Sequence, residues 1–132
     1  AIGSVDLHSL AQLYLGGPFN TFTTFVSLDS FNNDQVMPSV PALASLVPGI
    51  ENSTVSHIMQ AILGGVKTAY RNDGRPFLSV HMPKKSAYAV GQLLQWKMIE
   101  TVYLAHLLNI NPFDQPSVEL YKRETRKILS HG

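Results

Sequence analysis

Cysteine is absent from the 132 residues of the sequence. This absence excludes a disulfide scaffold, thiolate metal sites and thiol catalysis within the chain. It also fits a reducing compartment, so we expect a cytoplasmic protein.

Charged side chains are scarce and unevenly placed. Asp, Glu, Lys and Arg make up 14% of the sequence, against roughly 25% in an average soluble domain. No Lys or Arg precedes Lys67, so residues 1–66 carry four acids and no base, whereas residues 67–132 carry ten bases and five acids. The net charge of +1 excludes a strongly basic nucleic-acid-binding protein. So few charges predict that much of the surface is hidden in something larger.

Long apolar runs are also missing. The most apolar stretch, residues 87–108, is interrupted by polar side chains and falls short of the roughly 20 mainly apolar residues that a membrane span needs. No basic segment ahead of an apolar run marks a signal peptide. With 45% hydrophobic residues the chain is nevertheless too apolar for a disordered tail, and its length predicts one domain.

The spacing of apolar residues predicts an α/β fold. β-branched and aromatic residues predict strands over residues 21–28 and 77–82, and a single apolar stripe between them predicts a helix that is capped by Ser53 and ends at residues 72–74. Strand, helix and strand form a βαβ unit, whose right-handed crossover implies a parallel pair. Residues 29–52 contain three prolines and no sustained period, which predicts a long irregular excursion.

Three further helices are expected. The first covers residues 6–15, with Asp6 as its N-cap, and ends at residues 16–18, where glycine accepts the left-handed conformation. A second follows Ser86 to residue 108 and is apolar nearly all round, so we expect it to be covered on more than one side. The last runs over residues 116–130, with proline at its favoured first position.

Lys122 stands out on the last helix. At 100° per residue it lies at the edge of the apolar arc formed by Val118, Tyr121, Thr125, Ile128 and Leu129, while the other bases of residues 122–127 predict a solvated face. A lysine at such an edge either extends to solvent or is held in a cleft where its ammonium meets a substrate. The helical period alone favours the first alternative.

His8 is the most informative of five histidines. In the first turn of a helix, the positive end of the macrodipole disfavours imidazolium, and a neutral ring suits acid–base work. An isolated histidine is more often a surface or core residue with no functional role, so the residues alone favour that second alternative. The other four, His57, His81, His106 and His131, show no metal-ligand spacing, and we expect no metal and a solvated His57.

Three motifs, taken together, resemble one known family. The run NPFDQPSVELYK at residues 111–122 resembles the C-terminal signature of the glucose-6-phosphate isomerase family. DLHS-x-x-Q at residues 6–12 and GVKTAY at residues 65–70 resemble motifs of its shorter bacterial branch, and motif order and spacing agree through nearly all of the chain. One departure is Ser117, where the family usually has glycine; it leaves the spacing to Lys122 unaltered.

The resemblance implies a sugar-isomerase fold, which is a three-layer α/β/α sandwich around a parallel sheet. Residues 1–132 would then form the C-terminal part of the second such domain, including the C-terminal helix. The implied reaction is the interconversion of glucose 6-phosphate and fructose 6-phosphate through a cis-enediol, a step of glycolysis and gluconeogenesis. No metal or organic cofactor is implied, and the implied partners are a sugar phosphate, the N-terminal remainder of the polypeptide and a second identical subunit.

The resemblance also implies roles for three residues. His8 and Lys122 match the family's acid–base histidine and lysine, which assist ring opening by moving a proton between the ring oxygen and the C1 hydroxyl. Gln115 is expected to face the substrate. The family's glutamate and phosphate-binding loop lie upstream of the D-L-H motif and would fall before Ala1, so we predict that this chain alone is inactive. A non-catalytic sugar-phosphate-binding or regulatory module of the same fold remains the alternative.

Overall fold

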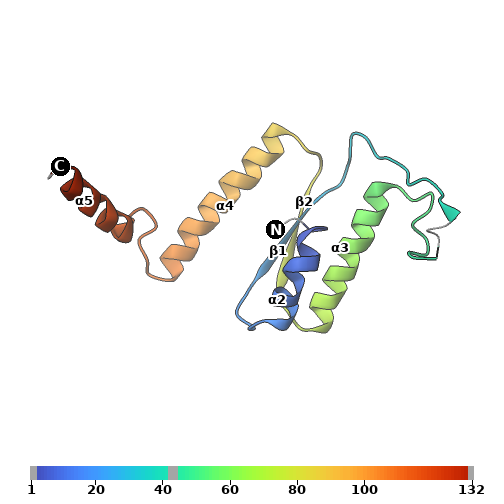
Figure 1. Cartoon of the computed structure of the whole chain (residues 1–132), viewed down its shortest axis with the longest axis horizontal. Helices are drawn as coiled ribbons and strands as arrows, with labels where there is room; N and C mark the ends of the chain where they lie inside the picture. Colours follow the sequence, from blue (N-terminus) through green and yellow to red (C-terminus); the bar gives the residue numbers. More distant parts are fainter. Residues whose placement is uncertain (1–2, 42–44, 131–132) are drawn as a thin grey trace. The chain divides into compact units, whose positions relative to one another are not determined.

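The computed structural model describes residues 3–41 and 45–130, which divide into two compact units, Ala1–Ser86 and Ala87–Gly132 (Figure 1). The first unit contains three helices, α1 (Asp6–Ser9), α2 (Ala11–Gly16) and α3 (Val55–Asn72), and two strands, β1 (Thr23–Leu28) and β2 (Phe77–Met82). The second unit contains helices α4 (Ala87–Leu107) and α5 (Pro116–Ser130).

The two strands form a parallel sheet, which confirms the predicted α/β class. The register places Thr23 opposite Phe77 and Leu28 opposite Met82, with α3 as the connection. β2 has the predicted bounds, whereas β1 begins two residues later than predicted. The register would pair residue 22 with Pro76, which has no backbone N–H, so the ladder cannot extend in that direction.

An aromatic cluster packs α3 against the sheet. Tyr70, at the end of α3, is only 4% exposed and lies edge-to-face against Phe25 of β1 and Phe77 of β2, with ring centroids 5.2 and 6.0 Å away. The Thr23 hydroxyl donates a hydrogen bond to the Tyr70 hydroxyl at 3.3 Å. Edge-to-face contacts of this kind contribute beyond the apolar area they bury, so the cluster is the core of the first unit.

The first predicted helix is interrupted. α1 and α2 are separated at Leu10, whose φ and ψ are −110° and −15°. The interruption is slight, because the Leu10 N–H donates to the Asp6 carbonyl at 2.7 Å and the Tyr14 N–H to the Leu10 carbonyl at 3.0 Å. The prediction of Asp6 as N-cap was wrong, since Val5 occupies that position and Asp6 is the first helical residue.

The end of α2 also differs from the prediction. Gly17 is extended, with φ −83° and ψ −174°, and does not take the left-handed conformation. Its N–H donates to the Leu13 carbonyl at 2.9 Å, and a Cβ at this position would overlap that same carbonyl oxygen. Glycine is therefore required here for close approach and not for a positive φ.

Arg75 holds the end of α2 against the turn between α3 and β2. Its Nη2 donates to the carbonyls of Leu15 and Gly17 at 2.6 and 2.9 Å, and its Nη1 to that of Pro18 at 3.3 Å. Its Nε donates to Asp73 at 2.8 Å, and the side chain is only 8% exposed. The last carbonyls of a helix lack intrahelical partners, so the guanidinium supplies the hydrogen-bond donors that α2 itself cannot provide. We call this set of contacts the Arg75 anchor.

The turn that presents Arg75 is set by its neighbours. Gly74 has a φ of +70°, a left-handed conformation that glycine adopts at little cost. The guanidinium carbon then lies 5.0 Å from the centroid of the Phe19 ring, a cation–π distance. The turn thus joins segments that lie more than fifty residues apart in the sequence.

The excursion over residues 29–52 is irregular, as predicted, and returns to the start of α3. The Met37 N–H donates to the Ser53 carbonyl at 2.9 Å, and the Val55 N–H to the Gln35 carbonyl at 2.8 Å. Asp34 reaches the first turn of α3, where its carboxylate accepts from the Ser56 N–H at 2.9 Å and from the Ser56 hydroxyl. Residues 42–44 of the excursion lie outside the described residues.

The cap of α3 is one residue later than predicted. The Thr54 hydroxyl accepts from the His57 N–H at 3.2 Å, and Thr54 has the extended backbone of an N-cap. The predicted cap, Ser53, instead donates to the Gly49 carbonyl at 2.8 Å. The end of α3 at Asn72 agrees with the prediction.

In the second unit, α4 and α5 agree with the predicted helices. α5 has the predicted bounds, and α4 starts directly after Ser86 but ends one residue earlier than predicted. Most large apolar side chains of α4 are exposed, including Tyr88, Leu94, Met98, Tyr103 and Leu107. The expected cover of α4 on more than one side therefore stays a prediction. None of the described helices combines the length and the apolar character needed to cross a membrane.

The Arg75 anchor predicts a stability effect. Arg75→Lys keeps the charge but loses the planar fork, which leaves helix-end carbonyls unpaired, so we expect the free energy of unfolding to fall by about 2 kcal/mol. Urea unfolding followed by circular dichroism measures this. The matched control is Arg71→Lys, because Arg71 is exposed and lies 5.5 Å from the Phe77 ring centroid, a contact that lysine can also make. Equal losses in the two variants would contradict the anchor.

The contact between Asp34 and Ser56 predicts a pH dependence. Hydrogen bonds from the Ser56 side chain, and then from its backbone, hold the pKa of Asp34 below its ordinary value of 3.8. Because the folded-state pKa is lowered, the stabilisation is complete above the unfolded-state value and is lost as pH falls through the folded value.

Asp34→Asn should therefore be less stable than wild type near neutral pH, and the difference should shrink below about pH 4. Urea midpoints measured along a descending pH series test this. Ser56→Ala removes the largest cause of the lowered pKa, so in this background the stability difference caused by Asp34→Asn should depend less on pH. A gap between wild type and Asp34→Asn that is constant with pH would show that the carboxylate has no such role.

Candidate active site

Lys122 lies at the edge position that the helical period predicts. Its side chain is 43% exposed, against 63%, 72% and 59% for Arg123, Arg126 and Lys127 on the same helix. Its Nζ donates to Glu119 Oε1 at 2.8 Å. The Lys122 ammonium is thus partly exposed and is held beside the carboxylate of Glu119, one helical turn earlier.

Gln115 lies at the start of the same helix. Its backbone carbonyl accepts from the N–H groups of Val118 and Glu119 at 2.9 and 3.2 Å, and its side chain is exposed. The preceding turn is shaped by Asn109, with φ +55°, and by Asn111, whose side chain accepts from the Phe113 N–H at 3.0 Å. The turn and the first backbone bonds of α5 therefore fix the place of Gln115.

Three polar residues of α5, and Gln115 directly before it, follow one line of the helical period. Their spacing of four, three and four residues repeats the helical period, so their Cβ atoms lie along one line of the surface. Glu119 stands within it between two cations, with Lys122 Nζ at 2.8 Å from one carboxylate oxygen and Arg126 Nη2 at 4.0 Å from the other. We call this set the α5 polar stripe: Gln115, Glu119, Lys122 and Arg126.

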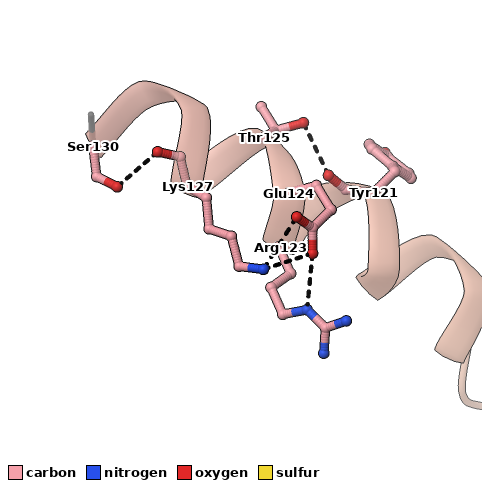
Figure 2. Close-up of polar contacts among 6 residues, drawn as sticks. All are labelled: Tyr121, Arg123, Glu124, Thr125, Lys127 and Ser130. Atoms are coloured by element: carbon pink, nitrogen blue, oxygen red, sulfur yellow. Dashed lines mark hydrogen bonds and ion pairs between the residues drawn. The ribbon is translucent and has the colours of Figure 1, made fainter. Parts of the chain in front are cut away.

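A second charged group lies on a different side of α5. Glu124 accepts from Lys127 Nζ at 2.9 and 3.1 Å and from Arg123 Nε at 3.4 Å (Figure 2). The three side chains are between 55% and 63% exposed, which confirms the predicted solvated face. The single basic run in the sequence is thus divided between two sides of the helix.

His8 is exposed on α1, in the first unit. α1 has only four residues, but its backbone hydrogen bonds continue through Leu10 into α2, so His8 lies near the start of a nearly continuous helix. The N–H of His8 donates to the Val5 carbonyl at 3.3 Å. Lys122 lies on α5 and Gln115 directly precedes that helix, whereas His8 lies in the other unit.

His81 has contacts that the spacing of histidines in the sequence does not reveal. It lies opposite Ser27 in the strand register, and its Nδ1 is 2.8 Å from the Ser27 hydroxyl and 3.7 Å from an Asp29 carboxylate oxygen. Both neighbours meet the same ring nitrogen, so the group lacks the relay arrangement of a catalytic triad. The only sequence-based prediction that could have revealed the contact between His81 and Ser27 was the parallel pairing of the two predicted strands.

The cavity between α3 and the sheet carries no acid–base chemistry. It has a volume of about 290 Å³ and is lined by side chains such as Leu7, Phe25, Met59 and Leu63 and by no charged residue. α1 contributes Leu7 to this cavity and not His8. Within residues 3–41 and 45–130, no three His, Asp or Glu side chains are grouped so that they could hold a metal ion. His57 is exposed as predicted, and His131 lies outside the described residues.

Similar proteins confirm the resemblance that the motifs indicate. The chain is 35% identical to glucose-6-phosphate isomerase of Levilactobacillus brevis, in a match that covers 96% of this chain and 28% of that protein. It is 34% identical to the enzyme of the same name from Onion yellows phytoplasma, and 32% identical to that from Carboxydothermus hydrogenoformans. These two matches cover 96% and 98% of this chain and 30% and 28% of the relatives.

A solved structure agrees with the fold. The crystal structure of the hypothetical protein TT0462 from Thermus thermophilus superposes with a TM-score of 0.85 at 34% identity, over 98% of this chain and 31% of that one. No protein-family model matches the chain. The chain therefore corresponds to less than a third of each of these proteins, and its fold is a partial α/β domain.

Proposed function

We propose that this chain is the C-terminal part of a glucose-6-phosphate isomerase, an enzyme that interconverts glucose 6-phosphate and fructose 6-phosphate. The observation that carries the proposal is the match over 96% of the chain to proteins of that name, and the positions of Gln115 directly before α5 and of Lys122 within it support the proposal. We further propose that the protein is cytoplasmic and that the complete enzyme is a homodimer.

Lys122 and His8 are the acid–base pair of ring opening in this proposal. One group removes the proton from the C1 hydroxyl while the other delivers a proton to the ring oxygen. The bond between C1 and the ring oxygen then breaks, its electrons pass to that oxygen, and C1 becomes a carbonyl. A cation that is already hydrogen-bonded and only half exposed, as Lys122 is, suits the stabilisation of a developing oxyanion. Gln115 contacts the sugar hydroxyls.

The later proton transfer between C1 and C2 needs a base outside this chain. In the proposal this base is a glutamate in the N-terminal remainder of the polypeptide, which also carries the phosphate-binding loop. Two features support a larger protein: the relatives are more than three times as long as the match, and a parallel sheet usually has both faces covered by helices and more than two strands. The scarcity of charge in residues 1–66 fits the same view.

The proposal predicts that the isolated chain is inactive. Incubation of the purified chain with glucose 6-phosphate, with contaminating isomerase excluded, should form fructose 6-phosphate no faster than buffer does. Titration calorimetry with the same sugar phosphate should give no heat of binding, since the phosphate loop is absent. Binding without turnover would favour the non-catalytic module. Turnover by the chain alone would contradict the proposal that part of the active site lies in the N-terminal remainder of the polypeptide.

In the complete enzyme, Lys122→Met should lower kcat at least about a hundredfold, because general acid–base groups contribute roughly 10²–10⁴-fold. Catalysed anomerisation of glucose 6-phosphate, followed by NMR exchange between the two anomers, should fall with it, since ring opening is common to both processes. The matched control is Lys127→Met, which removes an ion-paired lysine from the other side of α5. Similar rates in the two variants would remove Lys122 from the reaction.

A further inference from the structure

We propose that Glu119 is a positioning residue for Lys122, fixing its ammonium for proton transfer during ring opening. The inference rests on the proposed function and extends it to a residue with no assigned role. It is carried by the geometry of the α5 polar stripe, in which one carboxylate stands between Lys122 and Arg126 on the side of the helix that also bears Gln115.

The distances show how Glu119 is placed. Oε1 accepts from Lys122 Nζ at 2.8 Å, an ordinary length for a charge-assisted hydrogen bond. Oε2 is 4.0 Å from Arg126 Nη2, at the limit of an ion pair. The carboxylate is therefore held mainly by Lys122, with Arg126 attracting its second oxygen from the next turn of the helix.

Stability alone is a poor explanation for this contact. Lys122 and Glu119 are 43% and 58% exposed, and a pair of this exposure contributes roughly 0–1 kcal/mol to folding. The effect of the contact on the position of the Lys122 ammonium is larger. A lysine side chain has a flexible four-carbon stem with roughly 2 kcal/mol of rotamer entropy, and one hydrogen bond to its ammonium selects among its rotamers. A misplaced reacting group can cost up to roughly a hundredfold in rate.

The same helix provides an internal control. Glu124 and Lys127 have the same spacing of three residues and a Nζ–Oε1 distance of 2.9 Å (Figure 2). At 100° per residue they lie on a different side of α5 from the stripe. Loss of Glu124 should disturb helix stability and net charge as much as loss of Glu119. A difference between the two therefore reports on position relative to the reaction and not on the ion pair as such.

The test compares Glu119→Gln with Glu124→Gln in the complete enzyme. For Glu119→Gln we expect kcat for isomerisation and the rate of catalysed anomerisation to fall together about tenfold, with KM changed less than about twofold. Glu124→Gln should retain wild-type values for both rates. Equal rates in the two variants would overturn the inference.

A double variant tests whether Glu119 acts through Lys122. If it does, Glu119→Gln added to Lys122→Met should cause no further loss, since residues that act as a unit are non-additive. A further tenfold loss would assign Glu119 a separate role and overturn the inference. If Glu119→Gln fails to fold by circular dichroism, Glu119→Asp takes its place, because it keeps the charge while its shorter side chain retracts the carboxylate from Lys122.

The outcomes for the two proposals are separable. A complete wild-type enzyme without isomerase activity would refute the proposed function. An active enzyme in which Lys122→Met is impaired, but in which both Glu119 variants match Glu124→Gln, would refute only the positioning role.

Discussion

The buried guanidinium of Arg75 is the contact on which the first unit depends. It accepts no hydrogen bonds and cannot lose its charge, so its donors must all be satisfied where it lies. The carbonyls at the end of α2 and the carboxylate of Asp73 meet this requirement, and they bring the helices α1 and α2 to the turn before β2. The aromatic cluster around Tyr70 packs directly beside that turn. The position of the end of α2 thus depends on a contact made far along the chain.

Periodic features were predictable from the sequence, whereas features set by distant contacts were not. The bounds of β2 and α5 and the edge position of Lys122 follow from spacing that recurs within a short window, and the parallel pairing follows from the right-handed crossover between the strands. The Arg75 anchor joins residues more than fifty positions apart, and no local pattern marks Arg75 as buried. Gly17 was recognised as a helix end for the wrong reason, because its close approach to Leu13 exists only in three dimensions.

The residues of the candidate site also differ in whether local spacing predicts their positions. Gln115 and Lys122 lie seven residues apart, so the helical period alone places them on one side of α5, and Glu119 could have been added by the same reasoning. His8 was different: its assignment came from a motif, because an isolated histidine near the start of a helix does not by itself mark a functional residue. A resemblance between sequences can therefore assign a role to a residue for reasons that local physics does not supply.

The basic run is divided between two sides of α5, and this division determines how the helix attracts anions at long range. The polar stripe and the second charged group each contain two cations and one carboxylate, so the two groups carry the same net charge. An anion approaching from several Debye lengths away meets no difference between the two sides. Selection of one side must come at contact distance, from directional donors such as the Gln115 amide. Ionic strength should then affect how fast an anion reaches this helix much more than which side it occupies.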